Sequence, residues 1–319
     1  MSPKIRGIHH VTAIAGDPQQ NVDFYTGLLG LRLVKLTVNF DDPGAYHLYY
    51  GDEVGHPGTI LTFFSWPGAP QGRRGTGQVV TTSFSVPERA LGFWMERFEG
   101  RGVPFEGPAE RFDEQVVTFF DPDGLQLELV ASPDVDERSP WQEGPVPPDD
   151  AIRGFYGVTL SEEGFESTDA VLTGTLGFRL VKEADNWFRY QVGDGGPAAH
   201  ADVRVLPNAP SGRLALGTVH HVAWRTPNKA EQGAWRTRLA AQGVNVTPVI
   251  DRLYFHSIYF REPGGVLFEI ATDPPGFTVD EPQEQLGTHL KLPPWLEPKR
   301  TRVSRLLPSL RLPQMEREQ

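Results

Sequence analysis

The 319-residue sequence contains no cysteine. Disulfide bonds and thiolate metal sites are therefore excluded, and a bound metal would have to be held by histidine and carboxylate side chains. The sequence also lacks any apolar run approaching the ~20 residues that a membrane-spanning helix needs, and its first residues lack the apolar core of a signal peptide. We therefore expect a cytoplasmic protein with no membrane contact.

Positive charge is also scarce, with 30 Lys and Arg against 41 Asp and Glu, so the formal net charge is −11. A nucleic-acid-binding protein needs a basic surface for phosphate contacts, and this balance argues against one. The hydrophobic fraction of 39% is typical of a globular protein. The length suits two domains of roughly 150 residues each and leaves a homo-oligomer open.

Internal repetition is the most informative feature of the sequence. The segment LGLRLVK at residues 29–35 recurs as LGFRLVK at residues 176–182, an offset of 147 residues. A second pair relates GQVV at residues 77–80 to GTVH at residues 217–220, an offset of 140 residues. Four copies of one unit therefore follow one another along the chain.

Each unit is predicted to fold as a strand, a helix and three further strands. In the first unit, Asp17 can cap a helix that has Pro18 at its first position and ends at Gly30. Later helices are predicted near residues 87–100 and 228–242, each followed by two β-rich runs joined by a Pro/Gly turn. The expected fold class is α+β, built from four βαβββ units.

Proline-rich stretches divide the chain into parts. We expect units one and two in residues 1–135, a linker at 136–150, units three and four in residues 151–273, and a Pro-rich tail at 274–319. The tail carries some apolar side chains that would suit packing against the body. A surface tail is nevertheless the favoured interpretation.

Two His-His pairs and one glutamate are the candidate metal ligands. Adjacent residues on a strand point to opposite faces, so the two members of a pair should not both enter one cavity. In the aligned first strands, one face is mostly apolar and must pack under a helix, while the opposite face is polar and lines a cup. His10 and His221 fall on the cup face, whereas His9 and His220 fall on the helix side. On the last strand, Glu269 also points away from the apolar face.

The other units show where this ligand set is absent. Gly157 and Thr81 stand at the positions of His10 and His221, and Glu128 is the one remaining counterpart, matching Glu269. Units one and four should therefore pair around the metal, with units two and three as a structural partner. Two imidazoles and one carboxylate on one side of a metal suit a non-haem Fe(II) oxygenase, with Mn(II) as the nearest substitute.

Four sequence blocks carry a resemblance to a known family. They are GIHHVT at 7–12, YHLYY at 46–50, VHH at 219–221, and DR at 251–252 followed by YFREPGG at 259–265 and Glu269. With these blocks in order, the chain resembles the vicinal oxygen chelate superfamily, and within it the extradiol ring-cleaving dioxygenases that act on hydroquinones. The resemblance implies two barrel-like cups and a metal bound by His10, His221 and Glu269. It also implies a set of pocket residues, namely His9, Thr12, His220, Arg252 and Tyr259.

The resemblance further implies an Fe(II)-dependent dioxygenase that cleaves a hydroquinone or catechol-like ring with O₂, with both reactants at the open metal positions. Arg252 and Tyr259 would stabilise developing negative charge, although Arg252 has a surface cation as its alternative. Tyr259 stands opposite Glu269 if the turn between the last two strands has three residues, and Ile258 does so if it has four. For His9 and His220, proton transfer and hydrogen bonding to the ligands both stay open.

Two other function classes fit the same fold. A glyoxalase-type isomerase or thiol transferase would use the metal as a Lewis acid and usually takes a fourth protein ligand. A non-catalytic aromatic-binding protein would give the ligand set no role. The remaining histidines are expected to be surface or structural residues, namely His47, His56, His200, His256 and His289.

Overall fold

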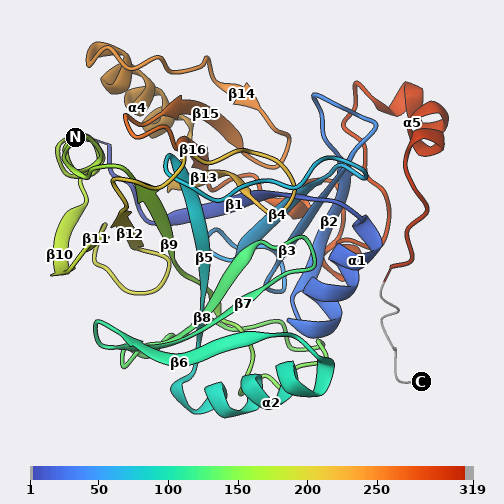
Figure 1. Ribbon diagram of the computed structural model, residues 1–319. Coiled ribbons are helices and arrows are strands. Elements are labelled where there is room, and N and C mark those ends of the chain that lie inside the picture. The colour runs from blue at the N-terminus through green and yellow to red at the C-terminus, as the bar shows by residue number, and fades with distance from the viewer. Residues whose placement is uncertain (1–2, 313–319) are drawn as a thin grey trace.

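The computed structural model describes residues 3–312, and its strands form two eight-stranded sheets that each curl into a cup (Figure 1). The first sheet contains, in spatial order, β14 (Ile250–Asp251), β15 (His256–Arg261), β16 (Leu267–Thr272), β13 (Val219–Thr226), β1 (Ile8–Ala15), β4 (Ile60–Ser65), β3 (Tyr46–Gly51) and β2 (Arg32–Val38). The second contains β10 (Arg179–Ala184), β11 (Trp187–Gln191), β12 (His200–Val205), β9 (Gly154–Glu162), β5 (Gln78–Val86), β8 (Gln126–Ala131), β7 (Glu114–Phe120) and β6 (Phe105–Arg111).

Each sheet joins two units through their first strands. β1 of unit one pairs antiparallel with β13 of unit four, and β5 of unit two pairs antiparallel with β9 of unit three. The predicted α+β class and the pairing of units one and four are therefore confirmed. Both sheets take strands from either side of residues 136–150, and the division of the sequence into two halves stays a prediction.

The helices lie on the outer faces of the sheets (Figure 1). Asp17 caps the first one by accepting hydrogen bonds from two backbone amides, as its sequence predicts, and Asn228 caps a later one. The helices are α1 (Pro18–Val22), α2 (Leu91–Arg101), α3 (Glu166–Asp169), α4 (Lys229–Ala241) and α5 (Arg300–Leu306). α1 and α3 continue as π-helices η1 (Asp23–Leu28) and η3 (Ala170–Leu176). Short 3₁₀ turns are η2 (Glu88–Ala90), η4 (Phe277–Val279), η5 (Gln283–Gln285) and η6 (Glu297–Lys299).

The main core lies between the helices and the convex faces of the sheets. On β16, Phe268 packs edge-to-face against Trp224 of β13, at a ring separation of 5.4 Å. Gln232 of α4 donates to the backbone oxygen of Ile270 at 2.8 Å, which holds the helix on this side of the sheet. Phe268 and Ile270 of β16 face the helix side. Because side chains alternate along a strand, Glu269 between them points to the opposite face, into the first cup.

The C-terminal segment packs against the first sheet, so the preference for a surface tail was wrong for residues 274–312. Leu290 forms a parallel bridge with Leu36 of β2, and Phe277 lies 5.1 Å from the ring of Tyr49. Apolar burial explains the docking, since six apolar side chains of the segment are buried: Phe277, Leu286, Leu292, Leu296, Val303 and Leu307. Residues 313–319 of the expected tail, and the first two residues of the chain, lie outside the described part.

The described helices are all too short or too polar to cross a lipid bilayer.

A buried ion-pair cluster anchors the C-terminal segment and provides a test of its role. Lys35 of β2 is fully buried and donates to Asp280 at 2.7 Å and to Glu281. We expect Lys35→Met to lower the free energy of unfolding by about 3–5 kcal/mol, because two carboxylates lose their cation. Urea unfolding measures this loss.

The matched control is Lys299→Met, at an exposed position of the same segment, which should change stability by no more than about 0.5 kcal/mol. A Lys35→Met protein as stable as the wild type would show that the ion pairs do not anchor the segment.

Candidate metal centre

Three side chains from three adjacent strands meet at the floor of the first cup. His10 comes from β1, His221 from β13 and Glu269 from β16, and all three are buried. The Nε2 atoms of the two histidines are 3.2 Å apart, and they lie 3.4 Å and 3.0 Å from Glu269 Oε2. The structure thus brings together the residues that the sequence singled out, and metal binding by them stays a prediction.

The arrangement is short of a cation. Ser257 donates to Glu269 Oε1, whereas Glu269 Oε2 is buried with no hydrogen-bond partner. Atoms at right angles around an ion at about 2.1 Å lie about 3 Å apart. The observed separations therefore fit a common metal ion.

A hydrogen-bonded neighbour orients each histidine of this group. His9 Nε2 lies 3.1 Å from the carbonyl oxygen of Thr272, to which it can only donate, so His9 Nδ1 is an acceptor for His10 Nδ1 at 2.9 Å. His10 Nε2 is then left unprotonated and faces Glu269, as metal binding requires. His220 and His221 repeat the geometry, with their Nδ1 atoms 2.8 Å apart.

Both supporting histidines are neutral. Burial, reinforced by the neighbouring His10, lowers the pKa of His9 well below its usual range. Burial likewise lowers the pKa of His220 to about 3. Burial also lowers the pKa of His221, although Glu269 opposes the shift. Neutral imidazoles are the form that binds a metal, so the centre is prepared for one.

The predicted placement of His9 and His220 on the helix side was wrong. The pairing of β1 with β13 shifts register between Ile8 and His10, and again at His220, so each strand contains an irregularity of the β-bulge type. A bulge inserts one extra residue and interrupts the alternation of side chains. The rings of His9 and His220 consequently lie 5.1 Å and 5.0 Å from those of His10 and His221.

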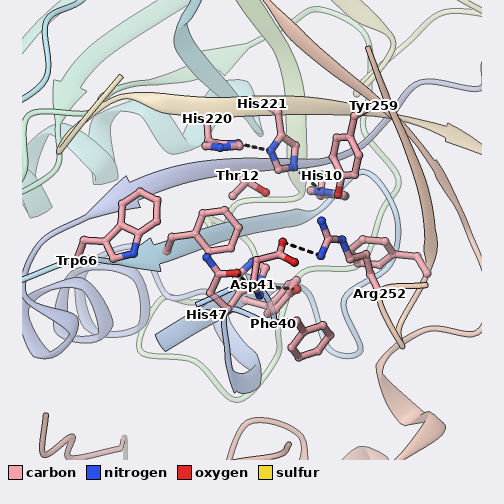
Figure 2. Close-up of a pocket in the computed structure, with 14 residues that line it drawn as sticks. His10, Thr12, Phe40, Asp41, His47, Trp66, His220, His221, Arg252 and Tyr259 are labelled. Atoms are coloured by element: carbon pink, nitrogen blue, oxygen red, sulfur yellow. Dashed lines mark hydrogen bonds and ion pairs between the residues drawn. The ribbon is translucent and has the colours of Figure 1, made fainter. Parts of the chain in front are cut away.

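The centre opens into a cavity of about 260 Å³ (Figure 2). Of the expected pocket residues, Thr12, His220, Arg252 and Tyr259 line this cavity and His9 lines a second one; a catalytic role for them stays a prediction. Six aromatic side chains line its walls: Phe40, Tyr49, Phe64, Trp66, Phe255 and Tyr259. A flat aromatic molecule would therefore find apolar contacts on several sides.

Arg252 and Tyr259 stand together beside the ligand group. Tyr259 pairs with Glu269 across β15 and β16, which settles the register in favour of the three-residue turn. The Arg252 guanidinium lies 5.6 Å from the centre of the Tyr259 ring. Burial, with the charge of Glu269 adding to it, raises the pKa of Tyr259, so its hydroxyl stays protonated. The pair can offer two hydrogen-bond donors to an oxygen anion.

His47 was predicted to be a surface or structural residue, and the structure places it in the cavity wall instead. Its Nε2 lies 2.9 Å from Thr62 Oγ1, and its Nδ1 lies 2.9 Å from the hydroxyl oxygen of Tyr49. Burial lowers the pKa of His47 well below its usual range. The sequence contained a signal for this placement, because His47 belongs to the block YHLYY, which carries the family resemblance. Its partner Thr62 is two residues before Phe64, which lines the same cavity.

The second cup shows how the same fold neutralises this carboxylate without a metal. Glu128, the counterpart of Glu269, accepts two hydrogen bonds from Arg111 at 2.9 Å and 2.6 Å, and a third from Ser83 at 2.7 Å. Gly157 and Thr81 replace the two histidines there. A guanidinium thus neutralises Glu128 in the second cup, whereas the guanidinium of the first cup, Arg252, pairs with Asp41 and leaves Glu269 without a cation.

Comparison with known proteins gives consistent results. The family model of the Glyoxalase/Bleomycin resistance protein/Dioxygenase superfamily matches residues 7–129 and 170–270. A Bacillus subtilis protein named "Putative ring-cleaving dioxygenase MhqO" is 51% identical over 97% of this chain and 98% of its own. The "Chlorohydroquinone/hydroquinone 1,2-dioxygenase" of Sphingobium indicum is 36% identical over 92% of this chain and 93% of its own. A crystal structure of a "putative dioxygenase" from Bacillus subtilis has a TM-score of 0.94 and 48% identity, covering 98% of this chain and all of that one.

The Arg111–Glu128 pair yields a stability test. We expect Arg111→Met to lower the free energy of unfolding by about 3–5 kcal/mol, since Glu128 would stay buried without its cation. Arg111→Met combined with Glu128→Gln should recover part of the loss, because the uncompensated charge is then gone. Arg89→Met, which removes an exposed pair, is the control. Equal effects of Arg111→Met and the control, measured by urea unfolding, would contradict this account.

Proposed function

Because the chain belongs to the glyoxalase/bleomycin resistance protein/dioxygenase superfamily and is a ring-cleaving dioxygenase, we propose that it is an Fe(II)-dependent enzyme of the extradiol type. Its substrates are a hydroquinone or catechol-like ring and O₂. The name of the Sphingobium relative supports the choice of a hydroquinone.

One observation supports the metal above all others. His10 Nε2, His221 Nε2 and Glu269 Oε2 converge within 3.4 Å of one another, and the glutamate oxygen has no donor. Two imidazoles and one carboxylate on one side of an ion form the set used by non-haem Fe(II) oxygenases, and Mn(II) accepts the same ligands. Bound Fe(II) would supply the electron density through which ground-state O₂ reacts with a closed-shell ring.

The side chains of the cavity bind and orient the ring. Phe64, Trp66 and Phe255 provide apolar surfaces for its faces and edges. Arg252 and Tyr259 donate hydrogen bonds to a phenolate oxygen and stabilise negative charge that develops on it. Of the two supporting histidines, His220 faces the cavity and can donate a hydrogen bond from its Nε2 to a substrate oxygen, since its Nδ1 accepts from His221, whereas His9 acts through His10 as a positioning residue.

The pseudo-symmetry of the first sheet argues against the isomerase alternative. Glu269 pairs with Ala223, two residues after His221, and the equivalent position in unit one is Thr62, which pairs with Thr12 two residues after His10. Threonine therefore occupies the place where unit one would supply a fourth ligand. Thr62 bonds instead to Thr12 and His47, at 3.0 Å and 2.9 Å. Three ligands leave room for two reactants.

The proposal is tested by oxygen uptake and metal analysis together. Fe(II)-loaded protein under reducing conditions should consume O₂ with at least one member of a hydroquinone and catechol panel. His221→Ala should lose both stoichiometric metal and O₂ uptake, because the remaining imidazole and carboxylate bind the ion less tightly. His289→Ala, at an exposed position, should retain both. Full metal retention by His221→Ala would sink the assignment of the ligands.

A second test separates Arg252 from the metal. We expect Arg252→Ala to lower kcat/KM on the order of 10²-fold with metal content intact, as for other donors to a developing anion. Arg252→Lys keeps the charge but removes the planar fork, so it should also lose turnover. Arg236→Lys on the exposed face of α4 is the control. Unchanged steady-state turnover in Arg252→Ala would exclude Arg252 from the chemistry.

A further inference from the structure

Two of the side chains that line the cavity carry full charges, and they neutralise each other. Arg252 Nη1 donates to Asp41 Oδ2 at 3.0 Å across the cavity mouth (Figure 2). The Arg252 side chain is 21% exposed and that of Asp41 is 74% exposed. Asp41 belongs to unit one and Arg252 to unit four, so the ion pair bridges the two units at the point where a substrate would enter.

The loop between β2 and β3 fixes the position of Asp41. The side-chain oxygen of the buried Asn39 accepts a hydrogen bond from the backbone amide of Asp41 at 3.0 Å. The backbone amide of Asn39 donates to the carbonyl oxygen of Ala45 at 2.9 Å. The ring of Phe40 packs edge-to-face against Trp295 of the C-terminal segment at 5.5 Å. These contacts fix the backbone on which Asp41 stands, and the hydrogen bond from Arg252 places its carboxylate at the mouth.

This geometry disfavours one class of substituent on the ring. A dihydroxybenzene that also carries a carboxylate would bring a second anion close to Asp41, and the one cation of the lining is already paired. Binding of such a ring would then be weakened by repulsion from Asp41, or would break the ion pair between Asp41 and Arg252. A neutral substituent meets mainly aromatic walls and incurs neither penalty.

We propose that Asp41 is a specificity-determining residue that excludes carboxylate-bearing rings and restricts the enzyme to dihydroxybenzenes with neutral substituents. The proposal rests on the function proposed above. An alternative role for the pair in stability carries little weight, because Asp41 is largely exposed and such pairs contribute little. Variants at Asp41 should therefore fold normally.

The test uses two ligands of nearly the same shape, 2,5-dihydroxybenzamide and 2,5-dihydroxybenzoate. Their affinities are measured by calorimetric titration of the metal-loaded protein without O₂. The wild type should bind the amide more tightly. Asp41→Asn should tighten binding of the carboxylate by about tenfold, from removal of one charge several ångströms away, and change that of the amide by less than about twofold. The gain should shrink at high salt.

Asp42→Asn is the matched control, since Asp42 is exposed in the same loop and does not line the cavity. An unchanged ratio of the two affinities in Asp41→Asn would overturn the proposal, as would an equal gain in Asp42→Asn, which indicates a general charge effect. This binding test does not depend on turnover. Absence of O₂ consumption would therefore contradict the proposed reaction, whereas the ratio of the two affinities alone decides whether Asp41 selects the ligand.

Discussion

The carboxylate of Glu269 is the constraint on which the rest of the first cup depends. Burying an ionised group without a partner is costly, and one of its oxygens lacks any donor. Two imidazoles facing that oxygen with unprotonated nitrogens would add no attraction of their own. The cost is acceptable if a cation completes the group. Arg111 is that cation for Glu128 in the second cup. The comparison of the two cups indicates that Glu269 needs a cation as well.

The two cups show how one repeated unit supports two outcomes. In the second, the positions of the paired histidines hold glycine and threonine, and a buried network of arginines and carboxylates fills the space: Arg111, Glu114, Glu128, Arg189 and Asp202. In the first, the corresponding space is an aromatic cavity beside the ligands. Filling one cup with salt bridges gives rigidity, whereas leaving the other open gives a place for chemistry, as expected when function is set by a site and not by a fold.

Repetition and strand periodicity were sufficient to predict the unit pairing and the convergence of His10, His221 and Glu269, because both depend on patterns that extend over many residues. Periodicity failed at His9 and His220, where a single extra residue per strand reverses the expected face without altering the local composition. The C-terminal segment was misjudged for another reason. Its burial depends on partners more than 200 residues away, such as Leu36 with Leu290, and no local pattern encodes such contacts.

The pairing of β1 with β13 also has a consequence for biosynthesis. β4 can cover one side of β1 early, but the other hydrogen-bonding edge has to wait for Val219–Thr226, about 200 residues later in translation. At about 5–20 residues per second, that edge stays unsatisfied for roughly 10–40 s on the ribosome. An unpaired strand edge is a template for pairing with other chains. The nascent chain is thus most exposed to aggregation while its N-terminal half is complete and its partner is still being made, which is when a ribosome-associated chaperone would have most to protect.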